Sequence, residues 1–219
     1  MEKKKPKKQK VILLAVLMVV AIVVGYYGYQ GYFYVKTEDA MVTGDIYKIA
    51  PKVAGKLKSV RIDEGSEVQS GQIIAEQEQV NATSSVQLEN TAIRSPITGV
   101  ILQRAAKEGE VVGAGNTVAL VVDKHQLYVQ ANVEETDAGY IALGQKVEIE
   151  LDMYPGRTFT GTVTKIGEAT QSTFSLLPPT NAGGNFTKVT QRIPIKIAFT
   201  EGPYDFQPGL NAKVKIHVR

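Results

Sequence analysis

Residues that could perform catalysis or hold a metal are few in this chain and far apart. It has no Cys and two His, His125 and His217, which excludes a disulfide framework, a thiolate zinc site and a cysteine nucleophile and leaves too few imidazoles for a histidine metal cluster. Ser172 and Ser175 lack a Gly-x-Ser-x-Gly context, and no Gly-x-x-x-x-Gly-Lys phosphate loop is present. The sequence therefore predicts no catalytic, metal or cofactor site, and we interpret the chain as a non-enzyme.

The positive charge of the chain is concentrated at its start. The formal net charge is +3, but residues 1–10 hold six of the 25 basic side chains and one of the 22 acidic ones. The remaining 19 basic and 21 acidic side chains give residues 11–219 a net charge of −2. A lysine cluster directly before an apolar run is typical of a cytoplasmic flank that attracts anionic lipid. The charge thus predicts a basic cytoplasmic tail at 1–10 and gives no support for nucleic-acid binding.

The next segment, residues 11–35, has no charged side chain and predicts a transmembrane helix. At about 1.5 Å per residue it is long enough to cross a hydrocarbon core of roughly 30 Å. Five of the ten tyrosines lie between residues 26 and 34, where rings with polar tips suit the outer headgroup layer. We expect a single-pass protein of the cytoplasmic (cell) membrane with its N-terminus inside and the bulk of the chain extracytoplasmic. The alternative, a cleavable signal peptide, lacks a small-x-small cleavage site after Val24.

An internal repeat follows the apolar segment. Nine residues separate the first two glycines of each copy and five separate the last two. Equal spacing predicts turns of equal geometry, because glycine adopts positive φ without steric cost. Short β-rich pieces lie between the glycines, so we expect two quasi-symmetric halves of one small β-sandwich. The copies are Pro51, Gly55, Gly65, Gly71 and Pro96, Gly99, Gly109, Gly115.

The two copies carry a resemblance to a known family. "APKVAGKLKSVRIDEGSEVQSGQIIAE" and "IRSPITGVILQRAAKEGEVVGAGNTVALV" resemble the halves of a biotinyl/lipoyl-like domain, in the split form of HlyD/EmrA-type membrane fusion proteins. "TEDAMVTGDIYKIAPKVAG", "LDMYPGRTFTGTVTKIG", "FSLLPPTNAGGNFTKVTQRIPIKI" and "FQPGLNAKVKIHV" are similar to other segments of the EmrA subfamily. A lipoyl or biotin carrier needs an acceptor lysine between the halves, but no lysine lies between Lys58 and Lys107. The chain is thus identified as a member of the membrane fusion family rather than a carrier.

The resemblance implies a lipoyl-like domain at 36–124, with halves at about 45–76 and 92–122, and a short linker at 77–91. Full-length members insert a long α-helical hairpin where this linker lies, so we interpret the chain as a short form without it. An outer-membrane channel engaged through such a hairpin is therefore in doubt.

As function, the resemblance implies a multidrug efflux adaptor. Its expected partners are a cytoplasmic-membrane transporter of the major-facilitator type and further copies of the chain. The alternative is an envelope-anchored structural or binding module that kept the scaffold and has no efflux role.

Residues 125–219 are expected to form a small antiparallel β-barrel, and the overall fold class is mainly β. Apolar and polar residues alternate over 146–152, 193–199 and 214–218, which is typical of strands buried on one face. We expect a hinge at Asp123 to Gln126, and a short helix or turn from Glu134 to Leu143 that ends at Gly144.

A long loop at 167–191 interrupts the barrel pattern. Apolar residues on a loop need burial against something, either the barrel itself or another protein. We hypothesise that the loop contacts a second protomer or the transporter. Its candidate contact residues are Phe174, Leu176, Leu177, Pro178, Pro179 and Phe186.

Overall fold

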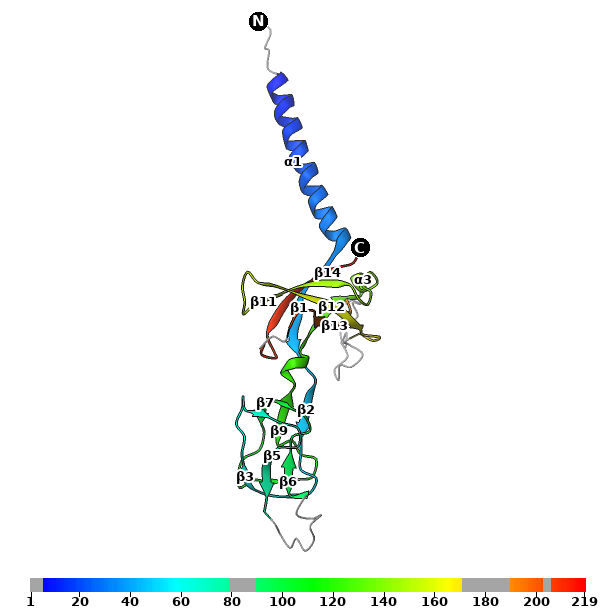
Figure 1. The fold of residues 1–219 in the computed structure, drawn as a ribbon. Coiled ribbons are helices and arrows are strands. Elements are labelled where there is room, and N and C mark those ends of the chain that lie inside the picture. The colour runs from blue at the N-terminus through cyan, green and yellow to red at the C-terminus, as the bar shows by residue number, and fades with distance from the viewer. Residues whose placement is uncertain (1–5, 79–89, 171–189, 203–205) are drawn as a thin grey trace, which may run out of the picture. The chain divides into compact units, whose positions relative to one another are not determined.

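The computed structural model describes residues 6–78, 90–170, 190–202 and 206–219 and is mainly β, with a long N-terminal helix (Figure 1). By compactness the chain divides into one unit made of residues 1–40, 131–197 and 212–219 and another made of 41–130 and 198–211. The β-barrel and the β-sandwich are each taken by themselves below.

Helix α1 spans Pro6–Phe33, and strand β1 (Tyr34–Thr43) begins at the next residue. Within it, Ile12–Phe33 is long and apolar enough to cross a membrane, and none of its described side chains is buried in the protein. The predicted end of the helix at residue 35 is wrong. Tyr34 and Val35 belong to β1, because the Val35 side chain is buried in the barrel, where a β-branched residue packs well on a pleated strand.

The barrel is closed by six strands in the order β1-β10-β13-β12-β11-β14. Assigning residues 36–43 to the sandwich domain was therefore wrong, since they form a barrel strand whose Val42 is fully buried. The predicted period-two alternation is confirmed, with Val147, Ile149 and Leu151 all pointing into the core. The other strands are β10 (Tyr128–Glu134), β11 (Lys146–Leu151), β12 (Thr158–Ile166), β13 (Arg192–Phe199) and β14 (Asn211–His217).

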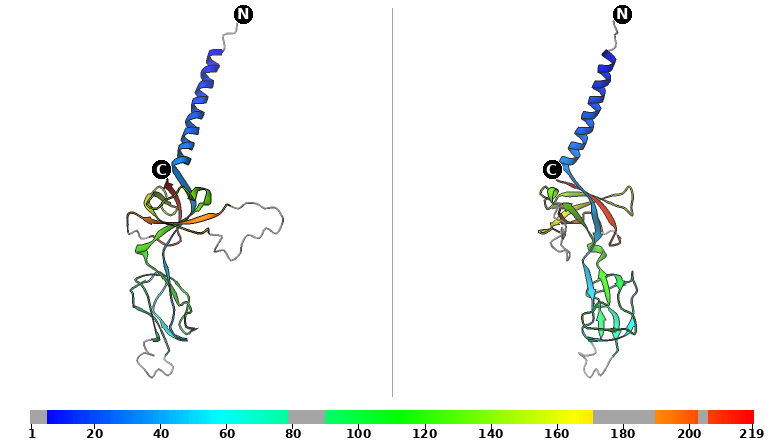
Figure 2. Two further views of the ribbon diagram at one scale, coloured as in Figure 1. Left: turned by 90° about the vertical axis from the view of Figure 1, so that its right-hand side faces the viewer. Right: turned by 180° about the vertical axis from the view of Figure 1, so that it is seen from behind.

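The sandwich consists of two facing four-stranded sheets, ordered β2-β9-β7-β4 and β6-β5-β3-β8 (Figure 2). A shift of 44 residues, the separation of Gly55 from Gly99, relates β2, β3, β4 and β5 to β6, β7, β8 and β9. When every strand is replaced by its counterpart 44 residues away, the strand order of one sheet becomes that of the other. Each sheet therefore contains two strands from each half. The bounds are β2 (Ile46–Ile49), β3 (Gly55–Val60), β4 (Glu67–Val68), β5 (Ile73–Gln77), β6 (Ala92–Arg94), β7 (Gly99–Arg104), β8 (Val111–Val112) and β9 (Ala119–Val122).

Backbone hydrogen bonds follow the same repeat. Gly65 N donates to Ile101 O at 2.8 Å, and Gly109 N, 44 residues later, donates to Leu57 O at 2.8 Å. Both glycines have positive φ, 85° and 84°, as do Gly71 and Gly115. The prediction of equal turns from equal glycine spacing is confirmed, and each turn is bonded to the opposite half, since Gly71 N and Gly115 N donate to Ser95 O and Pro51 O.

The sandwich core repeats as well. Six pairs of side chains in the hydrophobic core cluster are related by the 44-residue shift, and the one remaining member of that cluster, Val121, corresponds to Gln77 of the first half. Gln77 is the last residue of β5, directly before the segment that joins the halves. The pairs are Ile49 and Ile93, Leu57 and Ile101, Ile62 and Ala106, Val68 and Val112, Ile74 and Val118, and Ala75 and Ala119.

The predicted connections have structural counterparts. A 3-10 helix, η1 (Lys124–Gln126), lies at the expected hinge, and the short helix α3 (Glu135–Ala138) precedes a turn at Gly144. β5 and β6 are joined by residues 78–91 and β12 and β13 by 167–191; residues 79–89 and 171–189 lie outside the described residues. All six predicted contact residues fall there: Phe174, Leu176, Leu177, Pro178, Pro179 and Phe186.

Candidate interaction surfaces

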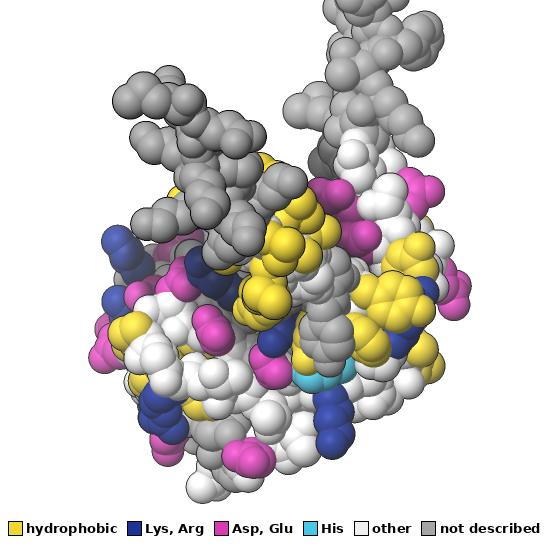
Figure 3. All heavy atoms as spheres, turned by 90° about the horizontal axis from the view of Figure 1, so that it is seen from above, with side chains coloured by type: hydrophobic (Ala, Val, Ile, Leu, Met, Phe, Trp, Pro, Cys, Tyr) yellow, Lys and Arg dark blue, Asp and Glu magenta, His cyan; other side chains and the backbone are white. Residues whose placement is uncertain are grey.

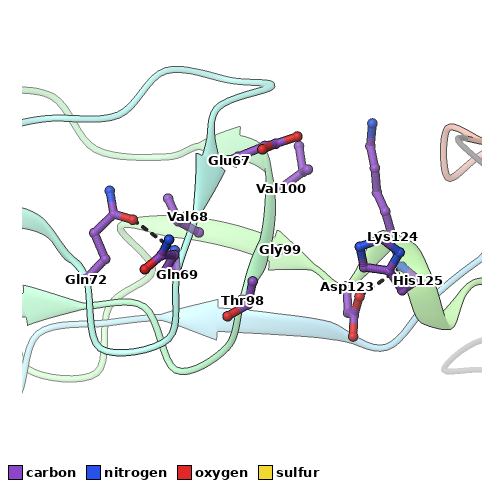
Figure 4. A pocket seen from close by; sticks show the side chains of 10 residues that line it. All are labelled: Glu67, Val68, Gln69, Gln72, Thr98, Gly99, Val100, Asp123, Lys124 and His125. Carbon is purple, nitrogen blue, oxygen red and sulfur yellow. Dashed lines mark hydrogen bonds between the residues drawn. The ribbon is translucent and has the colours of Figure 1, made fainter.

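A cavity of about 640 Å³ opens on the sandwich where β4, the start of β7 and η1 meet (Figure 4). Its floor is tightly packed at Gly99, since a Cβ on this residue would lie 2.1 Å from the backbone oxygen of Val122. The lining is mostly polar and includes His125, one of the two histidines. The lining residues are Glu67, Val68, Gln69, Gln72, Thr98, Gly99, Val100, Asp123, Lys124 and His125.

The polar groups of this cavity mainly stabilise their own turns. The Asp123 carboxylate accepts hydrogen bonds from His125 N and Gln126 Nε2, both at 2.8 Å, and so caps η1. Gln72 Oε1 accepts from Gln69 N at 2.8 Å, as Figure 4 shows on the opposite side of the cavity. Among the described residues no group of three or more His, Cys, Asp and Glu side chains could hold a metal ion. The cavity therefore offers a mostly polar contact surface.

A second polar cluster lies on the outer face of the barrel around Glu148. The alternation of β11 and β14 places Glu148, Lys215 and His217 on the same solvated face, where Glu148 accepts from Lys215 Nζ at 3.1 Å and lies 3.0 Å from His217 Nε2. The hydrogen bond with His217, followed by the interaction with Lys215, lowers the pKa of Glu148 below its ordinary value although partial burial opposes the shift. The same pairing raises the pKa of Lys215. Tyr34 completes the cluster, with its ring centre 4.1 Å from Lys215 Nζ and 4.5 Å from the His217 ring.

Further ion pairs surround this cluster. Lys213 Nζ lies 3.0 Å from Glu38 Oε1, which raises the pKa of Lys213, and Arg192 pairs with Asp39, which also accepts a hydrogen bond from Asn132 Nδ2 at 3.1 Å. A shallow cavity of about 280 Å³ lies among the charged side chains of β1, β11 and β14. Charges of alternating sign at 30% to 79% side-chain exposure are typical of a solvated face, where solvent screens the attraction within each pair.

The barrel end at which β1 begins carries exposed apolar side chains. Tyr140 and Leu143, in the turn between α3 and β11, are 54% and 66% exposed. The Arg219 guanidinium lies 4.1 Å from the ring centre of Tyr32, near the end of α1, and 5.2 Å from that of Tyr140. Figure 3 looks onto this end from the side of the helix, where apolar side chains, those of α1 among them, lie near the middle and charged ones are spread around them. Sequence reasoning missed this surface because it treated 134–143 only as a connection.

Family comparisons cover both β-domains. Residues 45–124 match the family model described as "RND MFP, barrel-sandwich hybrid domain". Residues 127–216 match the model described as "YknX-like beta-barrel domain". Together the two matches contain the sandwich and all barrel strands except β1 and the last residue of β14.

The chain is also similar to individual proteins over most of its length. The chain is 41% identical over 184 residues to "Putative efflux system component YhbJ" of Bacillus subtilis, covering 84% of this chain and 79% of that protein. It is 38% identical over 136 residues to "Colistin resistance protein EmrA" of Acinetobacter baumannii, covering 61% of this chain but 38% of that longer relative. Among solved structures, "Structure of the periplasmic adaptor protein EmrA" matches 85% of this chain and 99% of that chain with a TM-score of 0.58 at 15% identity, which supports the fold.

Proposed function

The chain belongs to the EmrA-type membrane fusion protein family, and from this premise we propose that it is the accessory adaptor subunit of a multidrug efflux system. The observation that carries the proposal is the 41% identity to a putative efflux system component over most of both chains, supported by the matches of residues 45–124 and 127–216 to an RND MFP barrel-sandwich hybrid domain and a YknX-like beta-barrel domain. An adaptor acts by contact and needs no reactive side chains, so the proposal includes no enzymatic activity and no cofactor.

In this proposal α1 anchors the chain in the cytoplasmic membrane, and the lysines of residues 1–10 keep the N-terminus inside. The sandwich and the barrel then lie outside the cytoplasm beside a transporter of the major-facilitator type, which supplies the energy for export. Several copies of the chain assemble around the substrate route. An outer-membrane channel is not part of the proposal, because the halves of the sandwich are joined by residues 78–91 and no long hairpin fits there.

The test is deletion of the gene in its host, followed by susceptibility measurements with a panel of hydrophobic compounds. We expect lower inhibitory concentrations for some compounds, restored by the full chain and not by a chain truncated before Tyr34. Because the chain has no Cys, single-cysteine variants of the whole protein also allow site-specific cross-linking in membranes and identification of the partner by mass spectrometry. Unchanged susceptibility together with no cross-linked transporter would refute the proposal.

A second candidate is an envelope-anchored structural or binding module. The short 78–91 connection favours it, since the segment that reaches a distant channel in full-length members is not accommodated there. Under this reading, cross-linking recovers envelope proteins other than transporters, and drug susceptibility does not change on deletion.

The long loop at 167–191 has a proposed contact role that a deletion can test directly. Its apolar residues, among them Phe174, Leu177 and Phe186, are proposed to contact a second protomer or the transporter. Deletion of residues 174–186 should weaken oligomerisation or transport while circular dichroism still reports a folded β-structure. Normal oligomers and normal export by the deletion variant would refute this contact.

A further inference from the structure

We propose that the turn formed by residues 139–145 inserts Tyr140 and Leu143 into the interfacial layer of the membrane that holds α1, so that the barrel has a second membrane contact beside its anchor. The inference rests on the proposed function in one respect, the anchoring of α1. In this proposal the turn contacts lipid, and the test below distinguishes that from contact with a protein.

The first argument is the junction of helix and strand. Helix α1 ends at Phe33 and β1 begins at Tyr34, so no linker separates the span from the barrel. Consecutive Cα atoms lie about 3.8 Å apart, which is less than the thickness of the headgroup layer on one side of a bilayer. When the apolar segment Ile12–Phe33 crosses the membrane, the barrel end where β1 begins is therefore at the membrane surface.

The second argument is that backbone pairing brings the turn to the same end of the barrel. β11 runs antiparallel to β14, with Val147 opposite Ile216, so the residues just before β11 lie beside those just after β14. Val218 N donates to Phe33 O at 3.0 Å, and Gln145 Nε2 lies 3.3 Å from Val218 O. A chain of hydrogen bonds thus connects the helix end, the chain after β14 and the turn.

The turn itself is held by its own hydrogen bonds. Gln145 is the central residue, because its Oε1 accepts from Ala142 N at 3.0 Å and its Nε2 donates to Tyr140 O at 3.2 Å. Gly144, with φ of 85°, donates to Val163 O at 2.9 Å. Ile141 is buried at 7% exposure, whereas Tyr140 and Leu143 on either side are held outward. The fold presents these two apolar side chains to their surroundings, and each is more than half exposed.

The chemistry of the surface fits a membrane interface. Tyrosine has an apolar ring and a polar hydroxyl and favours the headgroup depth, and leucine adds apolar area. Arg219, placed between the rings of Tyr32 and Tyr140, presents a guanidinium that can pair with lipid phosphate while its stem lies along apolar surface. Tyr32 belongs to α1, so the surface is continuous with the end of the proposed anchor.

The experiment uses the full chain with Leu143→Cys, labelled with the environment-sensitive fluorophore NBD and reconstituted alone into vesicles of phosphatidylcholine and phosphatidylglycerol. Met153→Cys is the matched control, because Met153 is 54% exposed and follows β11 at its opposite end. We expect the label at 143 to emit at shorter wavelength, to be quenched by a lipid with a shallow doxyl group, and to be at least about threefold less accessible to aqueous iodide than the label at 153.

Equal iodide accessibility of the two labels would overturn the inference. Protection of position 143 that arises only after a transporter is co-reconstituted would also overturn it, because the occupant would then be a protein. Flotation of the same vesicles and resistance to carbonate extraction report on α1 separately. A chain that floats with an iodide-accessible label at 143 refutes the second contact alone, whereas a chain that does not float refutes the anchor of the proposed function.

Discussion

The sandwich and the barrel bury similar apolar cores, but different features of the chain specify them. In the sandwich, turns, hydrogen bonds and core residues recur at a spacing of 44 residues, and backbones approach closely at glycine. In the barrel, six strands from distant parts of the chain close on one another, and cross-strand ion pairs cover the outer face. The sandwich therefore depends on backbone geometry at a few positions, whereas the polar outer face of the barrel tolerates change.

The largest effect is expected where the repeat is tightest. Gly55 and Gly99 are related by the 44-residue shift, but a Cβ at Gly99 would meet the backbone oxygen of Val122 at 2.1 Å, whereas at Gly55 it would meet the Gln77 side chain at 3.2 Å. Gly99→Ala must displace β7 from β9, so we expect a loss of about 3 kcal/mol or more. Gly55→Ala needs a small adjustment of Gln77 and should cost about 1 kcal/mol.

Denaturant unfolding of both variants, followed by circular dichroism, measures this difference. Wild-type chain in the same detergent is the reference. If both alanine variants lost the same free energy of unfolding, the Gln77 side chain would be as rigid a neighbour as the Val122 backbone. The expected difference between the two halves at Gly55 and Gly99 would then be absent.

The next effect tests the equivalence of the two halves. Leu57 and Ile101 occupy matching core positions, and each side chain is 1% exposed. Leu57→Ala and Ile101→Ala remove comparable apolar volume, so each should destabilise the sandwich by about 3 kcal/mol. The shift in the urea midpoint is the measurement, with the exposed Val111→Ala as a control that should change it little. A difference of more than about 2 kcal/mol between the core variants would contradict a shared core of two equal halves.

A smaller effect is expected at the turns. Gly65 and Gly109 have φ of 85° and 84°, and a Cβ at either would meet no atom within 4 Å. Alanine at either position should therefore lose only the conformational free energy of the left-handed region, about 1–2 kcal/mol. Gly65→Ala and Gly109→Ala should be destabilised by the same amount. Asparagine, which tolerates this region better, should restore part of the loss. Thermal midpoints of the Ala and Asn variants at Gly65 and at Gly109 provide the comparison, and a rescue absent at both sites would mean that contacts rather than φ require glycine.

Sequence alone predicted the sandwich well because its signals are local. Glycine spacing indicated the turns, and their positive φ values at Gly65, Gly71, Gly109 and Gly115 confirm the reason. Three strands of the barrel, β11, β13 and β14, were equally visible in their alternation. In β1, by contrast, the buried residues Val35, Ala40 and Val42 do not form one unbroken alternation. Its membership of the barrel depends on pairing with distant strands, which no local pattern reveals.

The candidate surfaces were harder to predict for the same reason. The turn before β11 contains Tyr140, Ile141 and Leu143, and no pattern in the sequence indicates that Ile141 is buried while the other two are exposed. That distinction arises from the barrel that surrounds the turn. The six loop residues chosen from sequence lie within 171–189, outside the described residues, and their contact role stays a prediction.

The smallest effect is expected on the outer face of the barrel. Glu148→Gln removes the charge that pairs with Lys215 and His217, but the Glu148 side chain is 40% exposed and solvent screens the interaction. We expect a loss below about 1 kcal/mol at pH 7. Because the pKa of Glu148 is lowered on folding, its stabilising contribution is present above the ordinary glutamate pKa and is lost as pH falls through the lowered value.

The measurement is the difference in unfolding free energy between the wild-type chain and Glu148→Gln from pH 7 down to pH 3. This difference should shrink toward zero at the acidic end, because the native carboxyl is then also neutral. Glu108→Gln, an exposed residue in the turn before Gly109 of the sandwich, is the matched control and should show no comparable trend. A loss at Glu148 as large as that at Gly99 would mean that the outer face of the barrel is as tightly specified as the sandwich.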